Sequence, residues 1–312
     1  MQITTTIQTQ SVYTSTTREA GLPKNSSKNQ LSDAIINQTF VQSPLWTDVR
    51  TLLSDMSYDD AYISRGEGTA KSLLKNIIKS HREWISSIID VSQFKYAYMT
   101  SGITEALNVW RLSDDRPIQM FDGDYQYPAM IGSDPRVVTS FDDVSPDEVL
   151  YISTPSAATG NYVDIPEIDC PVILDCAYIG STAASTVSVP KNTEQVMFGF
   201  SKGWGTIGQR LGIVYTKRPH PVLERLKRVE CFNYNNLFII ERLMEEFTIT
   251  EMHERALESQ LEICSDYDLD KSDVYFIANS TDDVYAKRRR TGTIARLCIS
   301  PLMKFDGEED GN

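Results

Sequence analysis

The sequence predicts an α/β protein in which a mostly parallel seven-stranded sheet is followed by a smaller α+β unit. Seven short apolar runs, each ending in turn residues, lie between residues 95 and 216. Helical stretches separate some of these runs, most clearly Thr104–Leu112, and such connections are typical of parallel strands. After Pro221 the pattern changes to amphipathic helices followed by two further β runs.

The strands of the predicted sheet are assigned from the apolar runs. They are Lys95–Thr100, Ile118–Asp122, Arg136–Thr139, Val149–Ser153, Val172–Asp175, Val196–Phe200 and Leu211–Thr216. Most of the chemically informative residues of the chain lie in the loops after these runs. Because an open α/β sheet binds ligands at the carboxyl ends of its strands, we expect a functional site at that edge.

Three segments outside this sheet have a recognisable pattern. Residues 1–40 are rich in Ser, Thr, Asn and Gln and are expected to form an extended arm. Leu45–Met56 predicts a short helix, and Ala70–Ile89 predicts a longer one because its apolar residues recur at intervals of three and four. The last residues, Asp306–Asn312, are acidic and expected to fray.

The second unit is expected to be mostly helical. Val222–Thr248 predicts one long amphipathic helix, or two helices with a break near Asn233–Asn236. Glu251–Ile263 predicts another helix, and β runs follow at Val274–Ala278 and Ile294–Ser300. The resulting domains are 1–45, an N-terminal arm with part of the small domain, 46–220, a large domain, and 221–312, a C-terminal small domain.

The composition argues against several classes of function. The 312 residues carry a formal net charge of −13, whereas nucleic-acid binding needs a basic face. The five cysteines are scattered without a CxxC pair, which indicates reduced thiols, and His81, His220 and His253 lie far apart in polar sequence, which argues against zinc. No apolar run is long enough to span a membrane, and Met1–Gln10 lacks the regions of a signal peptide. We therefore expect a cytoplasmic protein that binds no metal, membrane or nucleic acid.

The most informative motif is the glycine-rich segment Phe200–Gly212, which contains Lys202 and, eight residues later, Arg210. The lysine directly follows an apolar run, so it is expected to be partly buried. Burial and neighbouring positive charge lower the pKa of an amine and make it a nucleophile that can form a Schiff base. Arg210 can pair bidentately with a phosphate and keep the surroundings of the amine positive.

Three other groups follow predicted strands. Thr100–Leu107 opens a helix whose N-terminal N–H groups suit a phosphate. Tyr127, next to a proline, can present its ring to a flat ligand. Asp175 ends a buried strand, where a carboxylate needs a cation or donor such as a protonated pyridine nitrogen, and Tyr178 can reach a phenolate oxygen. Each group taken singly also has a purely structural interpretation: Thr100–Leu107 as a capped helix start, Tyr127 as one of several packed tyrosines, and Asp175 as an aspartate that caps a turn.

Together and in this order, the four groups resemble the fold-type I pyridoxal-phosphate enzymes, and specifically the class I/II aminotransferases. The resemblance implies that Lys202 forms the Schiff base with the cofactor and that Arg210 holds its phosphate. It also implies that Asp175 contacts the pyridine nitrogen and Tyr178 the ring 3-oxygen. The other implied cofactor contacts are the phosphate cup Ser101, Gly102 and Ile103, the ring-stacking Tyr127, and Tyr62, which would reach the cofactor phosphate of the neighbouring subunit.

The resemblance covers residues 58–300 and includes two more segments. Thr154–Gly160 is similar to the family's Asn-Pro-x-Asn-Pro-Thr-Gly loop. Ala295–Ser300 is similar to the strand whose arginine, here Arg296, clamps the α-carboxylate of the substrate. An arginine inside an apolar β run is unusual, and a substrate carboxylate would supply its partner. A structural ion pair is the other interpretation of Arg296.

The sequence departs from the family pattern in three respects. Ala157 stands where the family has an Asn that donates to the ring 3-oxygen, although Asn161 lies nearby in sequence and could compensate. Gly199 stands where many members have a phosphate-binding Ser or Thr. The chain is also shorter than typical members. These departures bear on reaction type and substrate more than on cofactor binding.

The resemblance implies a homodimeric aminotransferase that moves an amino group between an α-amino acid and a 2-oxo acid. In this hypothesis Lys202 holds the cofactor and moves the proton, Asp175 keeps the pyridine nitrogen protonated, and Arg296 orients the carboxylate. A lyase or decarboxylase with the same cofactor would use the same residues. A non-catalytic, cofactor-binding regulatory protein is a third possibility.

Overall fold

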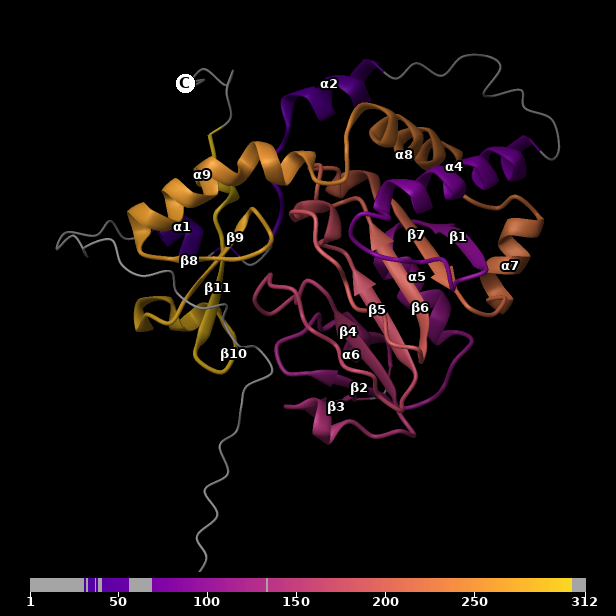
Figure 1. Cartoon of the computed structure of the whole chain (residues 1–312), viewed down its shortest axis with the longest axis horizontal. Coiled ribbons are helices and arrows are strands. Elements are labelled where there is room, and N and C mark those ends of the chain that lie inside the picture. Colours follow the sequence, from indigo (N-terminus) through magenta and orange to yellow (C-terminus); the bar gives the residue numbers. More distant parts are fainter. Residues whose placement is uncertain are drawn as a thin grey trace, which may run out of the picture.

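The seven predicted strands form one sheet, with strand order β1-β7-β6-β5-β4-β2-β3 (Figure 1). The computed structural model describes residues 31, 33–36, 38, 41–55, 69–132 and 134–304. The strands are β1 (Tyr96–Thr100), β2 (Ile118–Phe121), β3 (Arg136–Val138), β4 (Val149–Ser153), β5 (Val172–Cys176), β6 (Thr193–Gly199) and β7 (Gly212–Thr216). Each lies within, or within three residues of, the apolar run that predicts it.

Only β7 runs against the other strands of this sheet. It pairs antiparallel with both β1 and β6, while β2, β3, β4, β5 and β6 pair in parallel. Antiparallel neighbours need no crossover, so the segment with Lys202 can connect β6 to β7 directly. The carboxyl ends of β1, β2, β4, β5 and β6 therefore share one edge, and this edge gathers the loops that carry the candidate residues.

Helices cover both faces of the sheet, giving three layers (Figure 1). On one face, α5 (Gly102–Arg111) packs against β6, β7 and β1. On the other face, α4 (Thr69–Ile85) packs beside α8 (Tyr234–Glu246). The strands alternate between the two layers, so that Tyr151 and Ile173 face α5 while Leu150 and Leu174 face α4 and α8. Further short helices are α2 (Thr47–Asp55), α6 (Tyr127–Ile131) and α7 (Pro221–Arg228).

The predicted helical region Val222–Thr248 consists of two helices, α7 and α8, as in the second alternative. The break between them comes slightly earlier than Asn233–Asn236, because Glu230 adopts a positive φ of 55° and Asn233 caps α8. The cap is a hydrogen bond of 3.0 Å in which the Asn235 N–H donates to Asn233 Oδ1.

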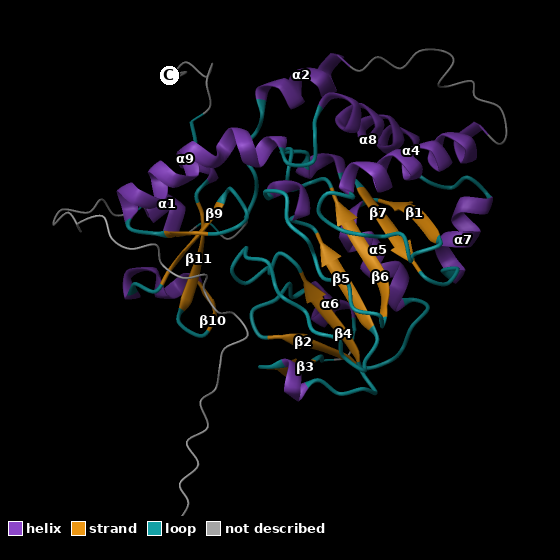
Figure 2. Ribbon diagram, in the orientation of Figure 1, coloured by secondary structure: helices purple, strands orange, loops and turns teal. Residues whose placement is uncertain are grey.

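A second, antiparallel sheet has the order β10-β11-β9-β8 and lies beside α9 (Glu251–Tyr267) and α1 (Asp33–Ile36) (Figure 2). Its strands are β8 (Asp270–Lys271), β9 (Ile277–Ser280), β10 (Arg289–Thr291) and β11 (Ile294–Cys298). Strand β9 begins later than the predicted run Val274–Ala278. The reason is that the Val274 and Tyr275 N–H groups donate to the carbonyls of Gly160 and Ser181 instead of to a strand.

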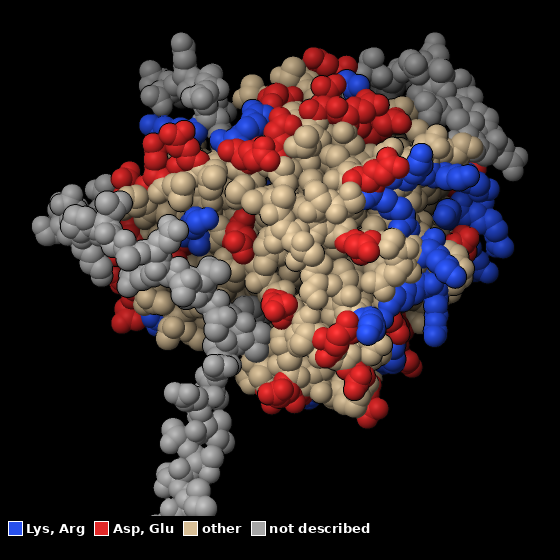
Figure 3. Space-filling model, viewed as in Figure 1, with Lys and Arg blue, Asp and Glu red and all other residues tan. Residues whose placement is uncertain are grey.

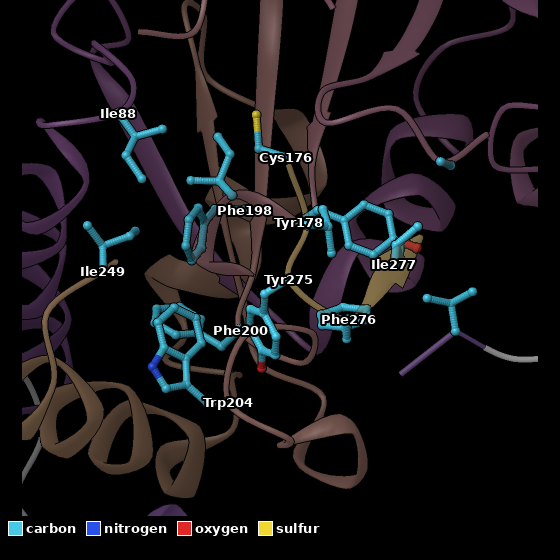
Figure 4. Close-up of a cluster of buried hydrophobic side chains, with 14 of the residues drawn as sticks. Ile88, Cys176, Tyr178, Phe198, Phe200, Trp204, Ile249, Tyr275, Phe276 and Ile277 are labelled. Atoms are coloured by element: carbon cyan, nitrogen blue, oxygen red, sulfur yellow. The ribbon is translucent and has the colours of Figure 1, made fainter. Parts of the chain in front are cut away.

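The two sheets share a continuous hydrophobic core (Figure 4). Phe200 and Trp204 from the Lys202 segment pack with ring centroids 5.7 Å apart, and Tyr178 packs against Phe276 at 6.1 Å. Tyr275 joins this cluster, and its hydroxyl accepts a hydrogen bond of 2.9 Å from Trp46 Nε1. Aromatic packing on both sides therefore fixes the Lys202 segment between the two sheets.

The prediction that the histidines lie in polar surroundings is wrong. His81 is fully buried, its ring stacks on Tyr215, and its Nδ1 lies 2.6 Å from the Tyr215 hydroxyl. Burial, and then Arg82, lower its pKa to about 3. His81 is polar in sequence context but occupies the apolar face of α4, where Leu74, Ile77 and Ile85 also lie. His220 and His253 are buried as well.

The described residues contain no group of three or more His, Cys, Asp or Glu side chains that could hold a metal ion. In the same part of the chain, no helix is both long and apolar enough to cross a membrane. All five cysteines are free thiols, and only Cys231 is exposed. Basic side chains gather at the edge that contains α7, whose last turn holds Arg225, Lys227 and Arg228 (Figure 3).

Candidate cofactor site

The loop that carries Lys202 is held in place by close backbone contacts. A Cβ on Gly203 would lie 2.3 Å from the carbonyl oxygen of Gly180, so only glycine allows the two segments to approach this closely. The Tyr275 hydroxyl donates a hydrogen bond of 2.8 Å to the Gly203 carbonyl. The Gly205 N–H donates to Ser43 Oγ at 2.8 Å. The lysine therefore projects from a loop fixed by both the second sheet and the N-terminal segment.

The Lys202 amine lies among charged groups from distant parts of the chain. Its Nζ donates a hydrogen bond to the Val41 carbonyl. Burial is the main cause that lowers the pKa of the amine to about 8, and Arg296 and Arg210 lower it further. Cys298 and Asp175 act in the opposite direction. A pKa near 8 leaves part of the amine neutral at physiological pH, as a nucleophile requires.

Asp175 lies at the end of β5, buried with 2% of its surface exposed. The Tyr151 hydroxyl donates to its Oδ2, and the Ala177 N–H donates to its Oδ1 at 2.8 Å. Burial, the largest effect, and the nearby Asp124 raise the pKa of Asp175 to about 7, while these hydrogen bonds and Lys202 oppose the rise. No Lys or Arg of the described chain forms an ion pair with Asp175. A bound cation would stabilise its carboxylate strongly.

Tyr178 follows β5 and is also buried. Burial is the main cause that raises the pKa of its hydroxyl. The charge of Arg296 lowers this pKa, and that of Asp175 raises it further. The structure thus brings Tyr178 together with Lys202, Asp175 and Arg296, as the motifs predict for a common site.

A second part of the site is the N-terminus of α5, beside Arg210. A Cβ on Gly102, the first residue of α5, would lie 3.4 Å from Arg210 Nη2, so the guanidinium covers the start of the helix. The same nitrogen donates to Thr104 Oγ1 at 2.9 Å. A helix N-terminus combined with an arginine suits a phosphate. Ser101 and Ile103 flank this position, and their role in a phosphate cup stays a prediction.

Arg210 adopts a backbone conformation that is unusual for a residue with a side chain. Its φ is +53°, in the left-handed region, at a cost of roughly 1–3 kcal/mol. The buried Asn236 side chain holds the strained segment by donating a 3.1 Å hydrogen bond from Nδ2 to the Arg210 carbonyl. The fold therefore maintains strain at the position that directs this arginine toward α5.

We expect Gly212→Ala to destabilise the protein by about 1–3 kcal/mol and to weaken phosphate binding. A Cβ at Gly212 would lie 2.8 Å from Gly102 Cα and 3.0 Å from Thr100 Oγ1, so it would push the α5 N-terminus away from Arg210. Thermal unfolding and titration with pyridoxal phosphate measure the two effects. The matched control is Gly208→Ala, whose Cβ would meet no atom within 4 Å. Equal behaviour of the two variants would contradict the prediction.

Tyr127 begins α6, and its side chain contacts α5. Its hydroxyl donates to Asn108 Oδ1 on α5 at 2.8 Å, and its ring-stacking role stays a prediction. Tyr125 lies near these charged groups. Burial raises the pKa of its hydroxyl and Asp175 raises it further, whereas Thr104 and Arg210 lower it. The Tyr125 and Tyr127 rings are nearly parallel, with centroids 6.2 Å apart. The sequence did not indicate Tyr125, because only Tyr127 stands directly before a proline.

Arg296 lies in β11, opposite Asn279 of β9. Its Nη1 donates to the Ala157 carbonyl, while its Nε is buried without a hydrogen-bond partner in the described chain. None of the described carboxylates forms an ion pair with it, which disfavours the interpretation as a structural ion pair. An unpartnered buried donor on an arginine indicates a site for an external anion such as a carboxylate.

The structure describes the residues at which the sequence departs from the family pattern, Ala157 and Gly199. Ala157 is buried beside Arg296, and the side-chain oxygen of Asn161 accepts a 3.1 Å hydrogen bond from the Asp273 N–H, so compensation by Asn161 stays a prediction. A Cβ on Gly199 would lie 3.4 Å from the Ile103 side chain, so Gly199 faces the phosphate cup. Tyr62 lies outside the described residues.

No protein-family model and no curated protein matches the sequence. The structure nevertheless resembles solved aminotransferases. An aminotransferase from Staphylococcus aureus is 10% identical with a TM-score of 0.58, and the match covers 89% of this chain and 93% of that chain. A probable N-succinyldiaminopimelate aminotransferase from Thermus thermophilus is 14% identical with a TM-score of 0.60, covering 84% and 89%. Alanine aminotransferase from Pyrococcus furiosus is 17% identical with a TM-score of 0.54, covering 80% and 74%.

These likenesses confirm the fold predicted from the motifs: the chain has the fold-type I architecture of the aminotransferases. The predicted mostly parallel seven-stranded sheet and the accompanying small α+β unit are both present.

Proposed function

We propose that the protein is a pyridoxal-phosphate-dependent aminotransferase that moves an amino group between an α-amino acid and a 2-oxo acid. One observation carries the proposal. The nucleophilic amine of Lys202, the buried carboxyl of Asp175 and the guanidinium groups of Arg210 and Arg296 influence one another at a single edge of the sheet.

The residues of this site fit the cofactor. The α5 N-terminus and Arg210 suit its phosphate, and Asp175, which no cation of the described chain pairs, suits its protonated pyridine nitrogen. The Lys202 amine, with its lowered pKa, would form the bond to its aldehyde carbon. When bound, the cofactor supplies the electron sink for a carbanion at the substrate Cα.

The remaining tasks belong to side chains of this chain. Arg296 binds the substrate carboxylate through its unpartnered Nε and so fixes which Cα bond is presented for cleavage. The Lys202 amine, which burial keeps partly neutral, would take and return the proton at the substrate Cα. The Asp175 carboxyl would keep the ring nitrogen of the cofactor protonated. Tyr178, which is buried, and Tyr125, which is half-buried, would limit the access of water to the cofactor ring.

We propose in addition that the protein works as a homodimer in the cytoplasm, with Tyr62 of each subunit directed to the neighbouring site. The free thiols are compatible with a reducing compartment. The division of the chain at residues 45 and 220 stays a prediction. Light scattering of the purified protein tests the dimer.

The experiment that tests the proposed function combines the visible spectrum with product analysis. The purified protein loaded with pyridoxal phosphate should absorb as a lysine-bound cofactor, and a panel of amino acids should yield 2-oxo acids and pyridoxamine phosphate. Release of carbon dioxide instead would identify a decarboxylase, and other cleavage products a lyase. A spectrum unmoved by every amino acid would identify a non-catalytic binding protein.

We expect the rate at which the apoprotein captures pyridoxal phosphate to rise with pH and to level off above about pH 8. The pKa of Lys202 is lowered to about 8, so the amine is mainly protonated below that pH and loses about tenfold in reactive fraction per pH unit. An ordinary lysine would instead keep gaining up to about pH 10.4. Stopped-flow absorbance measures the rate, and a profile that still rises at pH 10 would contradict the lowered pKa.

A further inference from the structure

Asn279 carries a buried acceptor that no described part of the chain satisfies. The residue lies in β9 and is 6% exposed. Its Nδ2 donates a hydrogen bond of 2.9 Å to the Thr159 carbonyl, and this bond fixes the orientation of the amide, because a flipped amide would set two oxygens against each other. The Oδ1 atom is buried without a hydrogen-bond partner among the described residues. Such an acceptor indicates a position at which a ligand or a water donates.

Arg296 carries the complementary unpartnered atom. Its Nη1 donates to the Ala157 carbonyl, whereas its Nε is a buried donor that has no acceptor in the described chain. Arg296 and Asn279 lie directly opposite each other in the antiparallel β9–β11 pair, so their side chains share one face of the sheet, with Cβ atoms about 4.5–5.5 Å apart. One small ligand can therefore satisfy both atoms if it offers an acceptor next to a donor.

This pair of side chains lies at the candidate cofactor site. Arg296 and Asn279 both donate to carbonyls of the loop after β4, those of Ala157 and Thr159. The charge of Arg296 also acts on Lys202 and on the Tyr178 hydroxyl. A ligand that contacts the pair is thus held near the amine of Lys202.

An α-amino acid offers the required groups on adjacent carbon atoms, a carboxylate that accepts and an ammonium that donates. We propose that Asn279 Oδ1 accepts a hydrogen bond from the α-ammonium group of the incoming amino acid while Arg296 Nε donates to its α-carboxylate. The inference rests on the proposed function, which assigns the carboxylate to Arg296. A 2-oxo acid presents a carbonyl oxygen in place of the ammonium, so the pair favours the amino acid over the 2-oxo acid.

N,N-Dimethylglycine is a suitable probe, because it carries a carboxylate and an ammonium N–H but, as a tertiary amine, forms no imine. Isovalerate has the same shape with carbon in place of nitrogen. In calorimetry on the full chain, with and without pyridoxal phosphate, dimethylglycine should bind about 10- to 100-fold more tightly than isovalerate. Betaine carries the positive charge without an N–H, so its advantage over its own carbon isostere, 3,3-dimethylbutyrate, should be at least about tenfold smaller. Equal affinity within the first pair, or an equal advantage in both pairs, would overturn the proposal.

Asn279→Leu should remove the preference for dimethylglycine and leave the affinity for isovalerate within about threefold, because Arg296 is retained. The matched control is Asn192→Leu. Asn192 Nδ2 also donates to a backbone carbonyl, that of Ile168, at 2.9 Å, but the residue directly precedes β6 and so lies at the opposite end of that strand from the site. The control should keep the preference.

The outcomes separate this inference from the proposed function. A preference that survives Asn279→Leu would overturn the role of Asn279, and if that variant does not fold, the two wild-type comparisons decide. Transamination by a wild-type protein without the preference would refute this inference alone. The preference without transamination would refute the proposed function and retain the amino-acid subsite.

Discussion

Lys202→Ala is expected to abolish the visible band of the bound cofactor and to lower kcat by at least about 10³-fold. The variant lacks both the amine that bonds the cofactor and the base that moves the Cα proton, and positioned proton transfer alone contributes about 10²–10⁴-fold. Non-covalent cofactor binding should persist, because Arg210 and the α5 N-terminus are untouched. Single-turnover kinetics and the spectrum after dialysis measure both effects.

The control for this variant is Lys191→Ala, which removes an exposed lysine at the opposite end of β6 from Lys202. It should keep the spectrum and the rate of the wild type. Thermal unfolding should show that Lys202→Ala still folds, because only one side-chain hydrogen bond, to the Val41 carbonyl, is lost. A Lys202→Ala protein that retains the dialysis-resistant band would refute the assignment of the amine.

Asp175→Asn is expected to lower kcat by about 10²–10³-fold while leaving the protein folded. The amide cannot carry the negative charge that stabilises a protonated ring nitrogen, whereas its oxygen can still accept from the Ala177 N–H and its nitrogen can donate to the Tyr151 hydroxyl. Because burial already raises the pKa of Asp175 to about 7, a neutral amide should not cost folding stability near neutral pH. Rapid kinetics with an amino-acid substrate measures the loss.

Asp122→Asn is the matched control for this second variant. Asp122 follows β2 at the same edge of the sheet, but its side chain is exposed. The control should keep wild-type activity and stability. If Asp175→Asn proved as active as the control, Asp175 would have a structural role at the end of β5 and not a role toward the ring nitrogen.

Local patterns were sufficient for the strands and for the Lys202 motif. An apolar run that ends in turn residues becomes a strand because burial favours it, and all seven predicted strands form, although the edge strand β3 is mostly exposed. Lys202 and Arg210 were found because both lie in one short glycine-rich segment. Asp175 and Tyr178 were found for the same reason, since their spacing is local.

The environment of other residues depends on tertiary packing and could not be predicted from local sequence. His81 looks exposed in sequence, yet the position of α4 on the sheet buries it against Tyr215. Tyr125 carries no sequence signal of function. Its position depends on the turn after β2, which brings it within reach of the charges of Asp175 and Arg210.

The sequence by itself therefore determined the α/β class and the order of the strands along the chain, and it selected Lys202 as the candidate reactive lysine, because these follow from neighbouring residues. The tertiary structure decided which charges surround that lysine. The effect of burial and of Arg296 on its pKa depends on distances between segments far apart in the chain, and only the packing of the two sheets sets those distances.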